Sequence, residues 1–443
     1  MNLDEIRIKE HAGLITSDTS TNQFSFFVIP LNNRIGAEKD DYVMVDHPVY
    51  GEKCPLLAVV RDIKNYMEVV GTTISERAVR TVSVCDIIGY VDLRNSEKGA
   101  LQRSPVSPNP GGKVYLPYSE FLEDVFTRTL DGKQFKTTLH LGKLASHASS
   151  KKGEIRPLNY FFDADEFAKQ HFLITGMSSV GKTYTATVIV EELANKTGKP
   201  IVILDSFGEY TTIGTANESL KDMVEKGILP RDKYPFNFNV LIYAVHPDEV
   251  KGTLEEQGVT HENDSKYIIK PIPQQWTEPS KETFSEIESK LSKDVKPNQV
   301  TVINSNGLQL TERRALFTRF VEALCSCRAK KSIEPFVLIV EENKALEEEV
   351  LKKIASEGRK MGISMCLLTQ HPAEIDGLVM SQMGTQFMSR TTTGTDLECL
   401  RNFTGENVQF LSQLRTGEWI VNGMTLIQPT RISIRDRYSL CSK

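Results

Sequence analysis

The hydrophobic positions of the first hundred residues fall into short apolar runs that turn-forming residues separate. The runs recur about every ten residues, which is typical of antiparallel strands joined by tight turns. Because such strands can close on themselves, the pattern predicts a small β-barrel. The runs are GLITS, FSFFVIP, DYVMVDHP, PLLAVVRDI and ERAVRTVSVCDIIGYVD.

The pattern changes near residue 166, where continuous apolar runs begin to alternate with segments at helical spacing. Continuous runs are typical of strands buried on both faces, and helices between them imply parallel neighbours. We therefore predict an α/β fold, a mostly parallel sheet flanked by helices. The runs lie at 172–175, 201–205, 298–305, 336–340 and 363–369, and a later pair lies at 385–392 and 417–423.

These patterns divide the chain into segments. We expect a barrel over 1–102 and an α/β core over 166–435, joined by a linker and lead-in over 103–165 that is rich in proline and glycine at its start. Within the core, 213–294 is polar and broken by prolines, which predicts a helical insertion. Residues 436–443 are left as a C-terminal tail.

Composition excludes several classes of protein. Hydrophobic residues make up 40% of the 443 positions and charged residues 25%, as in soluble globular proteins, and no run is long enough for a membrane span. We therefore expect a cytoplasmic protein without a membrane partner. The seven cysteines form no C-x-x-C pair, so neither a disulfide framework nor a zinc site is indicated. The net charge of −5 does not favour a whole-surface nucleic-acid binder, although it leaves room for a local basic channel.

The strand at 172–175 leads directly into a phosphate-binding motif. Residues 176–183 read G-x-x-x-x-G-K-T, in which the glycines let the backbone curl around phosphate oxygens at the start of a helix. Lys182 would reach the β- and γ-phosphates, and the Thr183 hydroxyl would hold Mg²⁺. The expected cofactors are ATP and Mg²⁺. The expected nucleotide-binding residues are Gly176, Ser178, Ser179, Val180, Gly181, Lys182, Thr183 and Tyr184.

Polar residues follow two of the later strands. The strand 336–340 ends at Glu341 and Glu342, and paired acids at such a place support the metal with its water shell and polarise the attacking water. The alternative is a pair of solvated glutamates. The strand 363–369 ends next to Gln370, an amide placed to sense the γ-phosphate. From position alone, Arg359 and Arg390 are equal candidates for neutralising phosphate charge, the other option being ordinary surface arginines.

Five motifs in order carry a resemblance to a known family. TGMSSVGKT, LDSFGEY, VLIVEEN, EGRKMGISMCLLTQHPAEIDGLVMSQMGTQF and LRTGEWIVNG resemble the HerA group of HerA/FtsK-type ATPases, and the likeness extends over about residues 1–435. The resemblance implies a RecA-like P-loop NTPase core behind a small barrel domain. It also implies a homo-hexameric ring that hydrolyses ATP between subunits and moves double-stranded DNA without sequence preference, beside a NurA-like nuclease or another effector, in DNA repair or defence.

The resemblance also assigns roles. Glu342 matches the catalytic glutamate, Glu341 the acid beside it, which holds Mg²⁺ through water, and Gln370 the γ-phosphate sensor. Arg359 aligns with the arginine that related ring motors offer to the neighbouring subunit's ATP. The chain departs from the family pattern at three places, which bear on coupling to DNA and on partner choice: SSV within the phosphate loop, Asn343 and Lys344 after the acids, and His371 after the glutamine.

Three functions are open at this point. The first is an ATP-dependent DNA translocase or helicase. The second is an ATP-gated scaffold ring that positions a nuclease or a defence effector with little translocation, which the altered residues near Glu342 and His371 favour. The third, a small-molecule phosphotransferase, fits the phosphate loop alone and leaves the barrel unexplained. Lys344, beside the acids, is a candidate DNA contact.

Overall fold

The computed structural model has two compact units. The first comprises residues 1–136 and 142–161, and the second residues 137–141 and 162–443. The chain passes between them within two strands, β8 (Thr138–Ser149) and β9 (Ile155–Asp163). The structure describes residues 5–29, 37–69, 77–94, 101–103, 106–129, 132–217, 222, 225–226, 238–259, 266–277, 280–423 and 429–440.

The first unit is a barrel, as the sequence predicts. Its sheet has the order β2-β1-β7-β3-β4-β5-β6, and β5 pairs back with β2, so that the strands from β2 to β5 in this order close a ring. One helix, α1 (Ser119–Phe126), follows. The strands are β1 (Arg7–Thr19), β2 (Gln23–Val28), β3 (Tyr42–His47), β4 (Gly51–Val69), β5 (Arg77–Val91), β6 (Leu101–Gln102) and β7 (Lys113–Pro117).

Buried residues recur at alternate positions along the barrel strands. Val43 and Val45 of β3, with Leu56, Ala58 and Val60 of β4, are buried in one core cluster. Alternate residues of a strand point to the same face, so these positions line the barrel interior. One boundary needs correction, because β7 belongs to this sheet although 103–165 was expected to be linker. A five-residue strand beside proline and glycine gives too short a pattern to be recognised.

The second unit is built on a long sheet that is parallel at its centre. Its order is β13-β12-β14-β11-β15-β16-β10-β17-β18-β19-β8-β9. Neighbours from β13 to β17 run parallel, whereas β17, β18 and β19 are antiparallel. The strands not yet given are β10 (His171–Thr175), β11 (Ile201–Asp205), β12 (Asn239–Ala244), β13 (Tyr267–Pro271), β14 (Gln299–Asn304), β15 (Phe336–Val340), β16 (Ile363–Thr369), β17 (Met383–Met388), β18 (Glu418–Gly423) and β19 (Thr430–Ile434).

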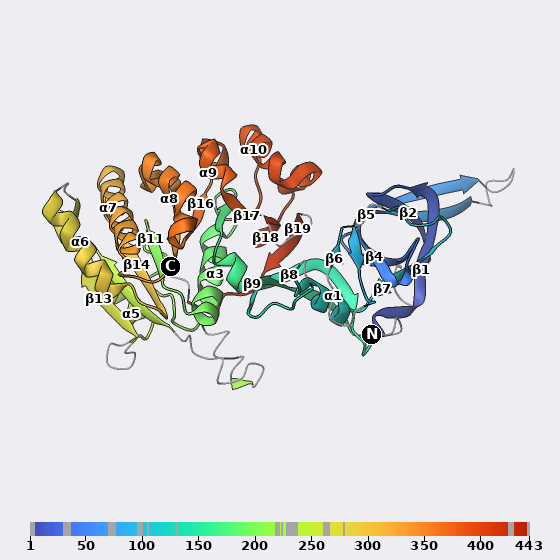
Figure 1. Ribbon diagram of the computed structural model, residues 1–443, viewed down its shortest axis with the longest axis horizontal. Helices are drawn as coiled ribbons and strands as arrows, with labels where there is room; N and C mark the ends of the chain where they lie inside the picture. Colours follow the sequence, from blue (N-terminus) through green and yellow to red (C-terminus); the bar gives the residue numbers. More distant parts are fainter. Residues whose placement is uncertain are drawn as a thin grey trace. The chain divides into compact units, whose positions relative to one another are not determined.

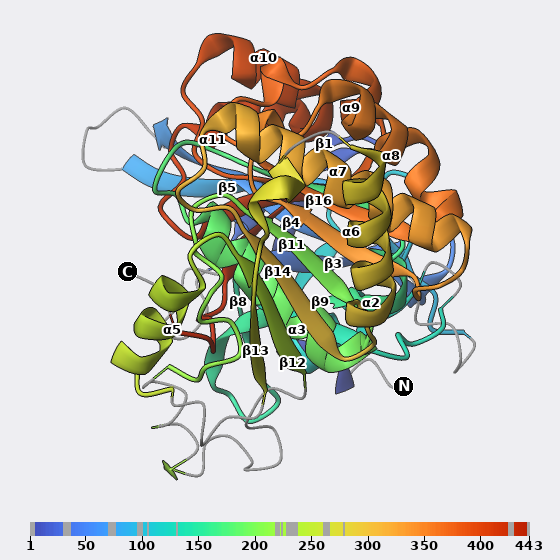
Figure 2. The ribbon, with the colours of Figure 1, turned by 90° about the vertical axis from the view of Figure 1, so that its left-hand side faces the viewer.

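Helices cover both faces of the parallel part. Figure 1 shows α6 (Lys281–Asp294), α7 (Leu310–Ala329), α8 (Glu348–Met361) and α9 (Gly377–Ser381) in a row on one side, with α3 (Lys182–Thr197) and α5 (Pro247–Glu256) on the other. Figure 2 shows the same two layers from the end of the sheet. Right-handed crossovers require this split, since the chain moves one way along the sheet through α3 and α5 and the other way through α6 to α9.

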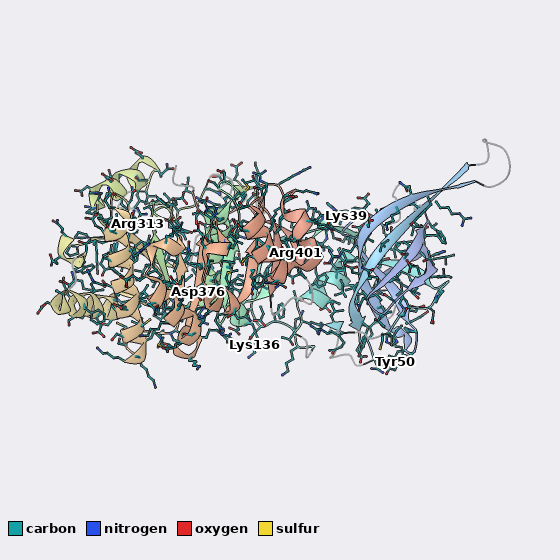
Figure 3. All side chains as sticks on the ribbon, turned by 90° about the horizontal axis from the view of Figure 1, so that it is seen from above. Lys39, Tyr50, Lys136, Arg313, Asp376 and Arg401 are labelled. Atoms are coloured by element: carbon teal, nitrogen blue, oxygen red, sulfur yellow. The ribbon has the colours of Figure 1, made fainter. Side chains whose placement is uncertain are left out.

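Shorter helices complete the unit. Asp376, labelled in Figure 3, caps α9 by accepting a hydrogen bond from the Leu378 N–H at 2.8 Å. The remaining helical elements are α2 (Ala164–Phe167), α10 (Gly394–Thr404), α11 (Val408–Leu411) and the 3₁₀ turns η3 (Gln274–Thr277), η4 (Asn343–Ala345), η5 (Pro372–Glu374) and η6 (Gly405–Asn407). In the described part of the chain, no helix is both long and apolar enough to cross a membrane.

Two expectations for the second unit are corrected. The range 213–294 is not purely helical, because β12 and β13 extend the main sheet beside β14. Their apolar runs are short and lie among prolines, which hid them. Of the expected tail over 436–443, residues 436–440 pack against the core, with Ser439 fully buried, and 441–443 lie outside the described residues. The contacts of 436–440 are with residues far away in the sequence, which no local pattern reveals.

Candidate functional site

The loop after β10 has the geometry that its glycines predict. A Cβ added at Gly176 would lie 3.0 Å from Val180 Cγ2 and 3.2 Å from Ser389 Cβ, so a side chain has no room there. Gly181 has φ 97° and Ser179 φ 62°, both in the left-handed region. Alternation of left-handed and ordinary residues turns successive N–H groups to one side of the chain, the concave arrangement that binds anions. Helix α3 begins at the next residue, Lys182.

Lys182 lies over this loop. Its Nζ donates to the carbonyl oxygens of Gly176 and Met177, at 3.0 and 2.8 Å. Burial lowers the pKa of Lys182 to about 8, although the nearby Glu209 carboxylate acts in the opposite direction. The amine is therefore held inside the anion-binding loop, where a phosphate would replace the two carbonyls as its partner and favour its charged form.

The paired acids end a fully buried strand, β15. Glu341 accepts a hydrogen bond from the Ser206 N–H at 2.9 Å, and burial, followed by the charges of Asp205 and Glu209, raises its pKa well above the usual range. Glu342 is half-buried and precedes the turn η4. Both acids line the open cavity described below, but they differ, because Glu341 also lies against the carboxylates of Asp205 and Glu209.

Asp205 shapes the loop that follows β11. Its carboxylate is buried and accepts hydrogen bonds from the N–H groups of Phe207, Gly208, Glu209 and Tyr210, at 3.2, 2.7, 3.1 and 3.0 Å. Burial raises the pKa of Asp205 and these four donors oppose the shift. The turn brings Phe207 and Glu209 to the cavity. Sequence reasoning found the LDSFGEY motif but assigned no role to either side chain.

The glutamine loop is joined to the acid loop. Thr369 Oγ1 accepts from the His371 N–H at 3.1 Å and donates to Asn343 Oδ1 at 3.4 Å. Lys344 and Glu374 form an ion pair of 2.8 Å, and His371 Nδ1 lies 3.5 Å from the Asp396 carboxylate. Asn343, Lys344 and His371, which depart from the family pattern, therefore contact neighbouring segments. Gln370 is exposed. In the sequence it stands between Thr369 and His371, two of the residues that make these contacts.

Strand order explains why these loops meet. β16 lies between β10 and β15 and is parallel to both, so the carboxyl ends of the three strands share one edge of the sheet. A cavity of about 580 Å³ opens there, within the range of small-molecule sites. It is lined by Ser178, Ser179, Gly181, Lys182, Thr183, Tyr184, Phe207, Glu209, Glu341, Glu342, Asn343, Lys344, Leu368, Thr369, Gln370, His371, Glu374 and Arg437.

Most of the expected site residues line this cavity, and three do not. Gly176 and Val180 shape the phosphate loop from behind, since Val180 is fully buried. Arg359 is exposed in the last turn of α8, which runs back to the amino end of β16. Burial, and then the Arg359 guanidinium, lower the pKa of His171, the first residue of β10, to about 4. The seven residues of β16 place Arg359 roughly 20 Å from the cavity of its own chain.

The other arginine weighed from the sequence lies beside the phosphate loop. Arg390 accepts a hydrogen bond at its carbonyl oxygen from the Met177 N–H, at 2.9 Å. The backbone just after β17 therefore supports the phosphate loop. The Arg390 side chain is not among those that line the cavity.

Arg437 is a lining residue that sequence reasoning missed. Its N–H donates to the Tyr184 hydroxyl at 2.8 Å, and its Cζ lies 5.6 Å from the centre of the Tyr184 ring. The surrounding sequence, RDRYS, has no hydrophobic period and belongs to no motif. Only the fold brings it to the cavity.

Comparisons with known proteins show which family the chain is similar to. The domain family described as "Helicase HerA, central domain" matches residues 139–319. A DNA double-strand break repair helicase HerA of Pyrococcus furiosus is 20% identical over 96% of this chain and 92% of its own length. A HerA of the same description from Sulfurisphaera tokodaii is 22% identical over 76% of this chain and 75% of its own.

This chain is similar to HerA-type ATPases over most of its length. A probable helicase of Methanocaldococcus jannaschii is also similar, with 25% identity over 79% of this chain and 78% of its own length. Among solved structures, VirB4 of Thermoanaerobacter pseudethanolicus aligns with a TM-score of 0.39 and 13% identity, over 68% of this chain and 97% of that one. The similarity to HerA helicases indicates an enzyme that hydrolyses ATP, and the cavity is where its phosphate loop opens.

The residues present suit ATP and a hard metal ion. The phosphate loop, the charged Lys182 and the volume of the cavity fit a nucleoside triphosphate. Hydroxyl and carboxylate oxygens, from Thr183, Glu341 and Glu342, are the donors that Mg²⁺ prefers. A divalent cation would also favour the ionised form of Glu341, whose pKa is otherwise raised.

Proposed function

We propose that this chain is an ATP-dependent DNA translocase, a motor that hydrolyses ATP to move double-stranded DNA without sequence preference. The observation that carries the proposal is the convergence of Lys182, Glu342 and Gln370 on one cavity of a HerA-type ATPase. Lys182 would bind the phosphates and Thr183 would hold Mg²⁺, which neutralises phosphate charge when bound, together with Glu341 through water. Glu342 would orient and polarise the attacking water, and Gln370 would contact the γ-phosphate.

We further propose a RecA-like core that assembles as a homo-hexamer. The strand β16 between β10 and β15 supports it, because it leaves room for a sensing residue between the phosphate loop and the acids. Arg359 supports assembly as well, since it lies near the amino ends of the strands, away from the cavity of its own chain. From there it would serve a neighbouring subunit's ATP. Hydrolysis would then depend on ring formation.

The names of the relatives support a proposal about the cellular setting. Four HerA relatives are described as DNA double-strand break repair helicases, and a fifth as a probable one. We propose a cytoplasmic role in DNA end processing beside a nuclease of the NurA type. A pull-down assay tests whether the chain binds such a nuclease. That test is independent of whether the motor moves DNA.

One observation favours a second candidate, an ATP-gated scaffold ring with slow hydrolysis. The Lys344 to Glu374 ion pair and the Thr369 to Asn343 hydrogen bond tie the acid loop to the glutamine loop. If these contacts restrain the loops during a catalytic cycle, ATP binding would hold a partner in place with little movement of DNA. This ring would position a nuclease or another effector.

The experiment that separates the two is steady-state ATP hydrolysis by the purified chain with and without linear duplex DNA. A motor shows turnover that rises with DNA and falls steeply with added salt, because its DNA contacts are mainly to phosphates. A scaffold shows turnover that ignores DNA. Glu342→Gln supplies the blank for contaminating ATPases, and Glu349→Gln, an exposed glutamate in the first turn of α8, is the matched control.

A further inference from the structure

The 435–440 segment follows β19 and is fixed to helix α3 by a buried ionic network. The Arg435 side chain is 5% exposed, and its Nη2 lies 3.1 Å from Glu191 Oε2 and 3.0 Å from Glu192 Oε1. Glu191 also accepts hydrogen bonds from the N–H groups of Tyr438 and Ser439, at 3.0 and 2.6 Å. Buried charges that are paired and hydrogen-bonded in this way hold a backbone in one position.

The far end of the segment is fixed too. The Leu440 N–H donates to the Thr215 carbonyl at 2.8 Å, and Thr212 Oγ1 donates to the Leu440 carbonyl at 2.9 Å. The segment therefore spans from α3 to the loop after β11, with Arg437 between its two anchors. A residue in this position has little freedom to leave the cavity that it lines.

Arg437 lines the cavity beside the start of α3, where its N–H donates to the Tyr184 hydroxyl. The terminal phosphate of a bound nucleotide must lie next to Glu342 and Gln370 for hydrolysis. The nucleoside half then extends away from the acids, toward Tyr184 and Arg437.

The chemistry of Arg437 suits a base. Its guanidinium lies over the Tyr184 ring, and the described residues give it one hydrogen bond, from Nε to the Ser439 carbonyl at 2.8 Å. A planar guanidinium stacks on aromatic rings and still presents N–H donors at its edge. Arg437 is 6% exposed, so its polar contacts are shielded from solvent. Such contacts are stronger there than in water.

We propose that Arg437, held against Tyr184 by the 435–440 segment, binds the nucleoside half of ATP by stacking on its base. The inference rests on the proposed function, because it takes the cavity to be the ATP site. It adds a nucleotide-recognition residue from a part of the chain outside every motif. Its role is in binding, so it affects the affinity for nucleotides and not the affinity for bare phosphates.

The test compares two probes, a non-hydrolysable ATP analogue and inorganic tripolyphosphate, by calorimetric titration in the presence of Mg²⁺. Loss of one base stack costs about tenfold in affinity. Arg437→Ala should therefore bind the ATP analogue about tenfold more weakly and bind tripolyphosphate as the unaltered chain does. Equal loss on both probes, or no loss on the analogue, would overturn the inference.

Three further variants make the result decisive. Arg437→Lys keeps a charge and the aliphatic stem but removes the planar group, so it should show the same selective loss if Arg437→Ala does not fold. Arg401→Ala removes an exposed arginine of α10, labelled in Figure 3, and should change neither affinity. Lys182→Ala should weaken the binding of both probes. If Lys182→Ala binds both normally, the proposed ATP site itself is wrong, whereas normal binding of the analogue by Arg437→Ala defeats only this inference.

Discussion

Two walls of the same cavity are built in different ways. The wall of strand ends carries Glu342 and Gln370 directly after buried parallel strands, so that the sheet alone brings them together. A second wall carries Arg437 on a segment without regular structure, fixed by buried ion pairs to α3. The first wall depends on local order that a motif encodes, and the second on long-range partners. We expect the first to control chemistry and the second to control nucleotide affinity and stability.

The largest expected effect is on the wall of strand ends. Glu342→Gln should reduce ATP turnover by about 10³-fold, because an amide cannot polarise the attacking water. Affinity for a non-hydrolysable ATP analogue should change by less than about threefold, since the altered group is not a phosphate ligand. Single-turnover hydrolysis and titration measure the two quantities. Turnover that survives the change would assign the chemistry to another residue.

Arg359→Ala should also reduce turnover, by about 10³-fold, without loss of nucleotide affinity, if the arginine acts on a neighbouring subunit's ATP. Mixing Arg359→Ala with Glu342→Gln protein then provides a strict check. Some interfaces in the mixture combine an intact Glu342 with an intact Arg359, so activity should reappear. A mixture that stays inactive while its subunits exchange would argue against action between subunits.

Changes to the wall that carries Arg437 should lower the stability of the fold. Arg435→Met leaves Glu191, which is fully buried, without its cationic partner. Breaking a buried ion pair from one side costs about 3 kcal/mol in the free energy of unfolding. Urea unfolding measures it, with Arg401→Met, at an exposed arginine, as the control. A cost below about 1 kcal/mol would mean that the network does not hold the segment.

Nucleotide affinity should depend on pH through Lys182, whose pKa is about 8. Below that pH the amine is already charged and binds phosphate directly. Above it the neutral amine must take up a proton on binding, so affinity for the ATP analogue should fall by up to about tenfold per pH unit between pH 8 and the higher pKa of the complex. Lys182→Arg should flatten this profile. An unchanged profile in that variant would assign the titration to another group.

The smallest effect concerns the two loops of the first wall. Lys344→Ala and Glu374→Gln both break the 2.8 Å ion pair, so they should change DNA-stimulated turnover alike, within about twofold of each other. If Lys344 contacts DNA, only Lys344→Ala lowers the stimulation. The comparison of the two variants therefore decides between a cross-loop contact and the DNA contact that the sequence suggested.

Much of the fold follows from local pattern. The continuous apolar runs predicted β10, β11, β14, β15 and β16, and the regular turns predicted the barrel strands, because burial on two faces or on one leaves a periodic record. The phosphate loop was predictable for another local reason. Its glycines are required by a close backbone approach at Gly176 and a left-handed residue at Gly181.

Other parts left no such record. β12 and β13 are short runs among prolines, and their place in the sheet depends on pairing with β14. Arg437 and Glu209 reach the cavity through hydrogen bonds made by Glu191 and Asp205, residues with no sequence signal for that role. The roles assigned to Glu341, Glu342, Gln370 and Arg359 stay predictions until the variants are measured.

The most direct test of the central claim is displacement of a third strand from duplex DNA by the purified chain. A DNA triplex at one position reports passage of a motor along the duplex, whether or not the duplex is unwound. We predict ATP-dependent displacement by the unaltered chain and none by Glu342→Gln. Absence of displacement by an active, DNA-binding ATPase would contradict translocation and favour the scaffold ring.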